Sequence, residues 1–218
     1  MKIALIGASG FIGGNILREA LAHGHQVTGI VRHPEKLEAQ KGLTALKCDV
    51  FDVPALTEAI KGHDVVVSAY KAPGEWTTQA AFDDYVNSYA AQAEAVKAAG
   101  VPRFLVVGGA ASLKLEDGTE LIDSPLFPPQ FLANKYGILG LREVFHNLKK
   151  ETGFDWGFFS PAAIIYDGER TGQFRWGTDK YFTDEKGESR ISVQDYAVAM
   201  VEEIEHPKYH QTRFTVAY

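Results

Sequence analysis

Three glycines near the start of the chain have the spacing of loops that bind phosphate. They lie in Gly7-Ala8-Ser9-Gly10-Phe11-Ile12-Gly13, a G-x-x-G-x-x-G pattern that follows an apolar run and precedes a helical pattern. In a loop between a strand and a helix, the first glycine permits a sharp turn and the second lets a pyrophosphate approach the backbone. The third lets the helix pack closely on the sheet, and the helix N-terminus offers unpaired N–H groups to the anion. The pattern predicts dinucleotide contacts from Gly7, Ser9, Gly10, Phe11 and Ile12; a purely structural glycine-rich turn is the alternative.

The residue after the second apolar run indicates which dinucleotide this is. Folds that prefer NAD usually carry Asp or Glu there, about 20 residues beyond the glycines, to bond the ribose hydroxyls. Here the position holds Arg32, within Ile30-Val31-Arg32-His33-Pro34, and no acid stands beside it. A guanidinium can hold a 2′-phosphate through paired N–H donors. We therefore predict NADP (NADPH) as the cofactor, with NAD as the second choice; a solvated arginine at a strand end is the structural alternative.

Two later loops should also lie along the dinucleotide, because ligands of open α/β sheets bind beyond the carboxyl ends of the strands. Asp49 and Val50 follow the third apolar run. Asp49 could accept a hydrogen bond from the adenine amino group, or it could cap a turn. Ser68, Ala69 and Tyr70 follow the fourth run and are expected beside the ribose that leads to the nicotinamide.

These residues require a sheet whose strands all end at one edge. Short apolar runs that suit strands occur at 2–6, 26–31, 43–47, 64–69 and 103–107, and helical patterns lie between them at 10–23, 54–60 and 79–99. Asp52 is expected to begin the second helix and Gly100 to end the third. The alternation of strands and helices with short loops predicts an α/β protein, with a doubly wound parallel sheet of the Rossmann type.

The second half of the chain has a looser pattern. A polar loop at 113–129 precedes a helix expected at 131–151 and a sixth strand at 156–160. The stretch 164–188 suggests a lid or small lobe, Ser192 has the position of a helix cap, and 213–218 is typical of a final strand. We predict a single domain over 1–218. In it, 1–161 form a six-stranded core, and 162–218 form a small C-terminal substrate lobe with a closing helix and strand.

Composition limits the partners of the protein. The 218 residues carry 22 Lys+Arg against 28 Asp+Glu, a net charge of -6, which argues against nucleic acid because phosphate binding needs a clustered basic face. The single Cys48 cannot form an internal disulfide, and His23-Gly24-His25 lacks a third metal ligand. No apolar run is long enough to cross a bilayer, and the apolar start suits a buried strand better than a targeting segment. We therefore expect a cytoplasmic protein with a small-molecule partner and neither metal nor membrane; the sequence indicates no oligomeric state.

Several motifs together resemble the atypical short-chain dehydrogenase/reductases. They are the glycine loop, Arg32, Cys48-Asp49-Val50, Val106–Ser112 and Phe159-Ser160-Pro161. Later segments, among them Gly168–Gly172 and Ile191–Ala197, resemble the NAD(P)H-binding proteins labelled NADH-flavin reductases, which are related to NmrA-like proteins. The resemblance covers essentially the whole chain. It implies a Rossmann fold, a nicotinamide cofactor, and further cofactor contacts from Gly108, Gly109 and Pro161.

The catalytic couple of that family is missing from this chain. Typical short-chain dehydrogenases use Tyr-x-x-x-Lys on the helix after the fifth strand, where Lys lowers the Tyr pKa so that the phenol can act as general acid/base. None of the nine Tyr here has Lys four positions later, and on the expected helix Lys135 and Tyr136 are adjacent. Neighbours on a helix point about 100° apart and cannot act as i,i+4 partners do. An isomerase-like or epimerase-like activity that uses Lys135, Tyr136 or Tyr166 has no positive support in the sequence.

Reduction of a flat, conjugated acceptor does not require the Tyr/Lys couple. Such a ring takes hydride directly from a nicotinamide and its proton from solvent, so the protein mainly orients it and excludes water. We predict an NADP-preferring oxidoreductase that reduces a flavin or quinone-like acceptor, with Ser112 and Tyr136 as candidate catalytic groups; Ser112 could equally cap a turn. Four aromatic residues could stack on the acceptor or form the core of the lobe: Phe174, Trp176, Tyr181 and Phe182. The alternative function is an NADP(H)-binding, redox-sensing regulator of the NmrA type without turnover.

Overall fold

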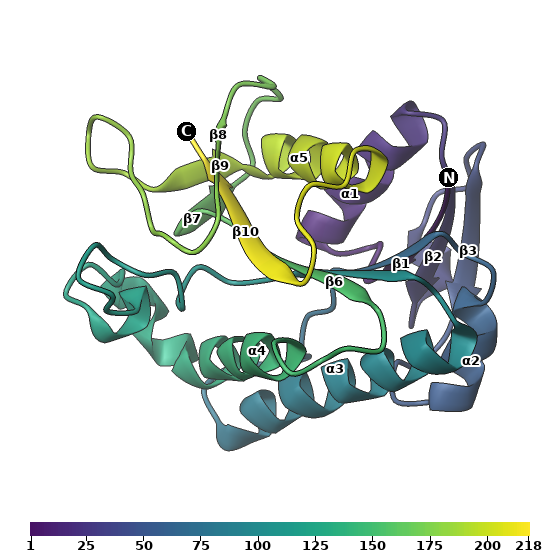
Figure 1. The fold of residues 1–218 in the computed structure, drawn as a ribbon. Helices are drawn as coiled ribbons and strands as arrows, with labels where there is room; N and C mark the ends of the chain where they lie inside the picture. Colours follow the sequence, from purple (N-terminus) through teal and green to yellow (C-terminus); the bar gives the residue numbers. More distant parts are fainter.

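The computed structural model describes residues 1–218 and contains one sheet of eight strands (Figure 1). In spatial order the strands are β3 (Leu43–Lys47), β2 (Gln26–Val31), β1 (Lys2–Ile6), β4 (Val65–Ser68), β5 (Arg103–Val107), β6 (Asp155–Ser160), β10 (Thr212–Ala217) and β8 (Arg175–Gly177). All neighbouring strands are parallel except β8, which is antiparallel to β10. The parallel strands end at one common edge, here called the carboxyl edge. This arrangement confirms the predicted doubly wound sheet.

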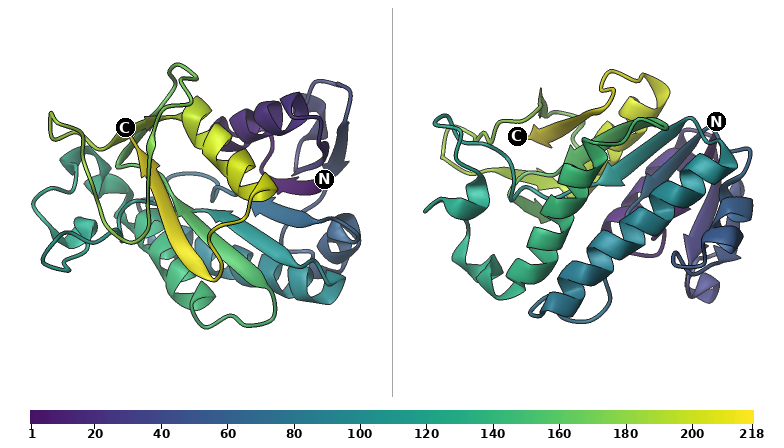
Figure 2. Two further views of the ribbon diagram at one scale, coloured as in Figure 1. Left: turned by 45° about the horizontal axis from the view of Figure 1, so that its top comes forward. Right: turned by 60° about the horizontal axis from the view of Figure 1, so that its bottom comes forward.

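Helices cover both faces of the sheet (Figures 1 and 2). α1 (Phe11–Ala22) and α5 (Val193–Glu205) lie on one face, and α2 (Val53–Ile60), α3 (Gln79–Ala99) and α4 (Lys135–Leu148) lie on the other. Ile3 and Leu5 of β1 belong to the core under α1 and α5, whereas Ala4 belongs to the core under α2, α3 and α4. Successive side chains of a strand point to opposite faces, and both faces here are covered, so the strand is apolar along its length. None of the helices combines the length and apolar composition that crossing a membrane requires.

The strand order reverses next to β1, which lies between β2 and β4. The connection after β1 passes through α1 on one face, and the connection after β4 passes through α3 on the other. In open α/β sheets, the crevice at such a reversal is where ligands bind. The fold therefore places the glycine loop, which follows β1, at this crevice.

The sheet is two strands wider than the predicted six-stranded core. β10 pairs in parallel with β6, from Thr212 opposite Gly157 to Thr215 opposite Ser160, and β8 then pairs with β10. α5 packs beside α1 on the same face. Residues after 161 thus contribute two strands and a covering helix to the main sheet, a larger share than the sequence indicated. Without them, β6 would present an open edge of unpaired N–H and C=O groups.

A lobe at the carboxyl edge is built from two separate loops, residues 108–134 and 162–192. The first contains the short 3₁₀ helices η2 (Leu121–Asp123) and η3 (Pro129–Asn134); the second contains β7 (Ile164–Tyr166), which pairs with β9 (Arg190–Ser192). Leu121 and Phe127 of the first loop are buried in a small cluster against which Tyr181 of the second loop packs. The sequence indicated only the second loop as part of a lobe. The helix expected at 131–151 begins at Lys135 because 129–134 form the tighter 3₁₀ turn. A third such turn, η1 (Pro34–Lys36), follows β2.

Candidate dinucleotide-binding site

The glycine loop has the backbone geometry that its sequence predicts. Gly7 has φ of 80°, a left-handed conformation that side chains disfavour, and its N–H donates to Ile30 O at 2.9 Å. A Cβ atom added to Gly13 would lie 2.2 Å from Gly7 O, so only glycine permits the contact between α1 and the end of β1. By contrast, a Cβ on Gly10 would meet Gly7 O at 3.3 Å, a tight contact that a shift of a few tenths of an ångström would relieve. Packing therefore restricts Gly10 less than Gly13, and space for a ligand at the backbone is a second reason for glycine at this position.

The N-terminus of α1 is open toward the cleft. The N–H groups of Phe11, Ile12 and Gly13 have no backbone acceptor, and no side chain caps the helix at Gly10. The first turn carries no acid, and Ser9 is exposed beside it. Unpaired N–H groups and the positive end of the helix dipole favour an anion there. This donor set fits a pyrophosphate.

A cleft of ≈ 350 Å³ extends from the glycine loop along the carboxyl edge toward β2 and β3. Eight of the predicted cofactor residues line it: Gly7, Ser9, Gly10, Arg32, Asp49, Val50, Ala69 and Tyr70. The structure thus brings together residues from four separate strand ends. The cleft is also lined by residues that the sequence did not indicate, among them Phe51, Lys71 and Asp84. Lys71 could have been found from its position directly after Tyr70, whereas Asp84 comes from α3 and has no local signal.

Arg32 is the unpaired cation at the far end of the cleft. Its side chain is exposed, and no carboxylate lies within ion-pair distance of it, because the nearby Glu35 pairs with His33 at 3.0 Å. Asp49 accepts the Phe51 N–H through Oδ1 at 3.0 Å, which is the turn-capping alternative that the sequence offered. Its Oδ2 accepts no hydrogen bond within the protein. Lys71 adds a second cation to the cleft, with its Nζ 5.2 Å from the centre of the Trp76 ring.

Tyr70 forms a fixed wall of the cleft. Its hydroxyl donates to Asp84 Oδ1 at 2.8 Å, and its ring packs edge-on against Tyr85 and Tyr89. Burial, assisted by the Asp84 carboxylate, raises the pKa of the Tyr70 phenol above its usual range. Burial likewise raises the pKa of the Cys48 thiol, and the charges of Asp52 and Asp49 add to that effect. Both groups are therefore neutral packing partners at neutral pH.

Six other predicted cofactor residues do not line this cleft: Phe11, Ile12, Ser68, Gly108, Gly109 and Pro161. Phe11 is 53% exposed at the mouth of the helix, whereas Ser68 is buried in β4. A Cβ on Gly108 would lie 2.4 Å from the Phe158 ring, so packing within the protein already requires glycine there. Gly109 O accepts the Ser160 hydroxyl at 2.9 Å, next to the buried Pro161. These last residues lie at the ends of β5 and β6, where the predicted nicotinamide half of the site would extend.

The two candidate catalytic groups are not brought together. Ser112 is buried, and its hydroxyl accepts a hydrogen bond from Arg213 Nη1 at 2.8 Å. Tyr136 is half-buried near the start of α4, with the Lys135 Nζ 5.5 Å from its ring centre. That contact places a cation over the ring face and is unlike the couple in which Lys and the phenol oxygen act together.

The aromatic residues of the second loop are packed inside the protein. Phe174, Trp176 and Phe182 pack against the core under α1 and α5, and the Trp176 ring is stacked 5.7 Å from Tyr209. Tyr181 packs against the small cluster of the lobe. Of the two roles open to these residues, the contacts favour a core over an acceptor platform.

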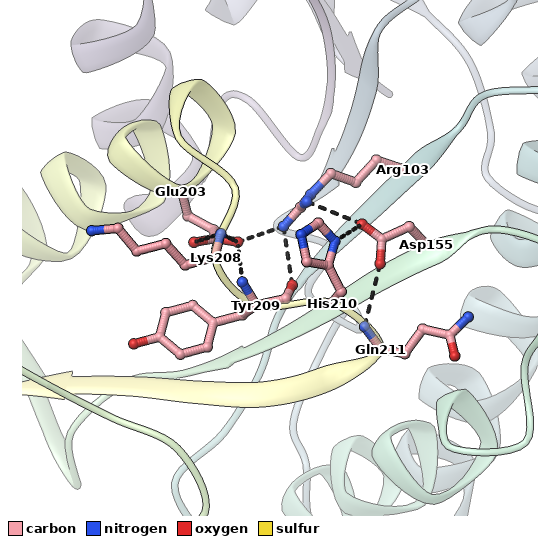
Figure 3. Close-up of polar contacts among 7 residues, drawn as sticks. All are labelled: Arg103, Asp155, Glu203, Lys208, Tyr209, His210 and Gln211. Atoms are coloured by element: carbon pink, nitrogen blue, oxygen red, sulfur yellow. Dashed lines mark hydrogen bonds and ion pairs between the residues drawn. The ribbon is translucent and has the colours of Figure 1, made fainter.

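A cluster of charged residues lies at the opposite edge of the sheet, where β5 and β6 begin (Figure 3). Arg103, at the start of β5, pairs with Asp155 at 3.0 Å and with the buried Glu203 of α5 at 2.5 Å. Glu203 also accepts the N–H groups of Lys208 and Tyr209. These bonds join the ends of α5, β5, β6 and the segment before β10. The charges satisfy one another within the fold, which indicates a structural role. Nowhere in the chain do three or more His, Cys, Asp or Glu side chains gather as a metal ion would require.

The sheet reversal, the open helix N-terminus and the cleft together define a dinucleotide-binding protein of the Rossmann type. The profile of the NAD(P)H-binding family matches residues 7–207, and the chain belongs to that family. It is similar along its whole length to the uncharacterised protein YwnB of Bacillus subtilis, with 40% identity over 222 residues that cover 99% of this chain and 98% of YwnB.

Two solved structures are similar to the whole chain. A candidate epimerase from Bacteroides thetaiotaomicron has 46% identity and a TM-score of 0.91, covering 100% of this chain and 96% of that one. A candidate NADH-flavin reductase from Streptococcus pneumoniae has 33% identity and a TM-score of 0.86, covering 100% and 99%. These similarities confirm the family resemblance and the nicotinamide-binding fold. The names of the two neighbours denote different reactions.

Proposed function

We propose that this protein is an NADP-preferring reductase that transfers hydride to a flavin or quinone-like acceptor. The observation that carries the cofactor preference is the exposed, unpaired Arg32 in a cleft whose other end is the open N-terminus of α1. The free N–H groups of the loop bind the pyrophosphate, and the Arg32 guanidinium holds the 2′-phosphate through charge-assisted hydrogen bonds.

The class of acceptor follows from the groups that the chain lacks. A bound, reduced nicotinamide supplies hydride transfer as its chemistry. Lys135 and Tyr136 do not form an acid/base couple, and the Ser112 hydroxyl is engaged by Arg213. An acceptor that takes its proton from solvent does not need such groups. The chain's own residues then orient the two rings, and the lobe excludes water from them.

The test is a set of steady-state assays of NADPH consumption with riboflavin, FMN, FAD and a water-soluble quinone as separate acceptors. Turnover with at least one of them is expected. Arg32→Asp should raise the KM for NADPH and leave kcat nearly unchanged, because Arg32 lies far along the cleft from the reacting ring. NADPH binding, measured by calorimetry, without turnover on any acceptor would contradict the proposal.

A regulator that binds NADP(H) without turnover is the second candidate. The observation that favours it is the buried Ser112–Arg213 hydrogen bond, which engages the serine expected near the reacting groups. Under this function, NADP and NADPH should bind with clearly different affinities, since a redox sensor must distinguish them. The turnover assays above therefore separate the two candidates, and calorimetry with NADP and with NADPH tests the regulator directly.

A further inference from the structure

A second cavity lies on the α4 face of the sheet, apart from the dinucleotide cleft. Its volume is ≈ 250 Å³, and its walls come from the C-terminal half of α4, the starts of β6 and β10, and parts of the two loops of the lobe. α4 is the last helix on this face, and the cavity lies where the helix meets β10. No residue of this cavity lines the dinucleotide cleft.

Arg213 of β10 is a buried cation in the wall of this cavity. It is 2% exposed, donates to Asp179 Oδ1 through Nε at 2.9 Å, and lies 4.5 Å from the centre of the Phe145 ring. Burial lowers the pKa of the guanidinium more than the Asp179 carboxylate raises it. Asp179 is the carboxylate that pairs with Arg213, and it is shared with a second cation, Lys114.

Lys149 is a second cation of the wall, and it has no carboxylate partner. Its Nζ lies 5.1 Å from the Phe145 ring, on which Arg213 also packs. The acids of the wall are already engaged: Glu120 pairs with Arg142 at 2.6 Å, and Asp179 pairs with Arg213 and with Lys114. Positive charge is consequently in excess around the cavity.

Trp156 of β6 supplies a donor without an acceptor. The residue is 2% exposed and lines the cavity, and its Nε1–H has no hydrogen-bond partner in the protein. An indole N–H can only donate, and buried donors nearly always have an acceptor. Because Nε1 itself has almost no accessible surface, a ligand oxygen would reach it through a small rotation of the indole toward the cavity.

We propose that this cavity binds a small oxyanion, a carboxylate or a phosphate group, through the Trp156 Nε1–H and the Lys149 ammonium, with Arg213 supplying further positive charge. The volume lies below that of pockets for drug-sized ligands, which restricts the ligand to a small metabolite or to one charged end of it. This assignment does not depend on the function of the dinucleotide cleft.

The proposal is tested by NMR of the ¹⁵N-labelled full chain, following the three tryptophan indole N–H signals. The Trp76→Phe and Trp176→Phe variants identify the Trp156 signal. Sodium acetate and inorganic phosphate are titrated separately at constant ionic strength, with chloride as the third titration. We expect a saturable shift of the Trp156 signal with acetate, with phosphate or with both, and the anion that saturates identifies the group recognised.

Two lysine variants control for non-specific charge effects. Lys149→Gln should weaken the binding about tenfold, the loss of one charge-assisted contact. Lys150→Gln removes the same charge from the neighbouring residue, which does not line the cavity, and should bind as the parent does. No saturable shift, an equal shift with chloride, or equal binding by both variants would overturn the proposal; the first of these is expected if only a water occupies the site.

Discussion

Two kinds of residue determine the dinucleotide cleft. Arg32 contributes a charge, because its side chain is exposed and unpaired. Gly7 and Gly13 contribute the absence of a side chain, because a Cβ on either would meet backbone atoms at 2.5 Å or less. A change at Arg32 should therefore alter which ligand binds, whereas a change at Gly13 should alter whether the loop forms.

Arg32→Asp should reverse the cofactor preference. The carboxylate repels a 2′-phosphate and can accept hydrogen bonds from ribose hydroxyls, so the Kd for NADPH should rise about tenfold or more while the Kd for NADH does not rise. Isothermal titration calorimetry measures both. Lys36→Asp makes the same charge change four residues away, outside the cleft, and should leave the ratio of the two affinities unchanged. Equal affinities for the two cofactors that Arg32→Asp does not alter would contradict the assignment.

Gly13→Ala should destabilise the protein by about 1–3 kcal/mol, because the new methyl would overlap Gly7 O and force α1 away from β1. Gly14→Ala is the matched control, since its Cβ would meet no atom closer than Ala8 O at 3.6 Å. That substitution should stabilise the helix by about 0.5–1 kcal/mol. Urea unfolding measures both free energies, and similar values for the two variants would disprove the steric account.

Among the elements, the boundaries set by local chemistry could be predicted from the sequence. Asp52 accepts the Ala55 N–H at 3.1 Å to begin α2, Gly100 ends α3 with φ of 67°, and Ser192 accepts the Asp195 N–H at 3.0 Å to begin α5. Each of these predictions is confirmed, because the cap and the residue it serves lie within three positions of each other. The 3₁₀ turn before α4 was missed, since its conformation accompanies the packing of the lobe.

The second loop of the lobe is tied to two helices by polar contacts that join residues distant in the sequence. Arg170 donates twice to Glu19 of α1, at 3.0 and 2.7 Å. Asp195 of α5 accepts the N–H groups of Thr171 and Gly172, each at 2.8 Å, and the Tyr218 hydroxyl at 2.7 Å. No local pattern announces these pairings. They explain why the sequence could indicate a lobe at 164–188 but could not place it.

Asp195 should make the stability of the protein depend on pH. Burial alone would raise the pKa of this carboxyl, but the bonds from Thr171, Gly172 and Tyr218 outweigh it and hold the pKa below its usual value. A carboxylate with a lowered pKa in the folded state stabilises the protein above the unfolded pKa of about 3.9 and loses that contribution as the pH falls through the folded value. Asp195→Asn should therefore cost stability at pH 7, and the difference from the parent should shrink below about pH 4.

The measurement is urea unfolding of both proteins at a series of pH values. Asp167→Asn changes an exposed acid near the same contacts and provides the comparison for the loss of a negative charge. A difference between parent and Asp195→Asn that stays constant from pH 7 to pH 3 would show that the carboxylate's charge has no part in holding the loop.

At the scale of the whole molecule, the cluster around Arg103 joins the two halves of the chain at the edge opposite the cleft. Arg103→Met should cost about 3–5 kcal/mol, because it leaves the buried Glu203 charge without its partner. The double variant Arg103→Met, Glu203→Leu should recover a large part of that loss. Thermal and urea unfolding measure both, and dinucleotide affinity should change little in either variant. If the double variant is no more stable than Arg103→Met, an unpaired buried charge is not the cause of the loss.

The arrangement of the whole molecule explains which residues of the cleft could be predicted from the sequence. Eight residues of the cleft were predicted because each follows a strand, and parallel strands must end at one edge. Asp84 was missed because it reaches the cleft from the second turn of α3, where it accepts the Tyr70 hydroxyl. The bond between Ser112 and Arg213 spans 101 positions, so a serine that resembles a family's reactive group by position is held by a partner that no motif identifies.

The positions of the dinucleotide cleft and the lobe along the chain have a consequence for how such proteins can diversify. Every residue of the dinucleotide cleft lies between positions 6 and 84, and the cluster that holds the lobe together lies wholly after position 107. A recombination event within α3 would therefore keep the residues of the cleft together. The packing of α1 on α5 and the Arg170–Glu19 ion pair would have to form anew between the two parts. Relatives that share the first part and differ in the second would bind the same dinucleotide and act on different metabolites. A chimera joined within α3 is a direct way to create such a pair in the laboratory.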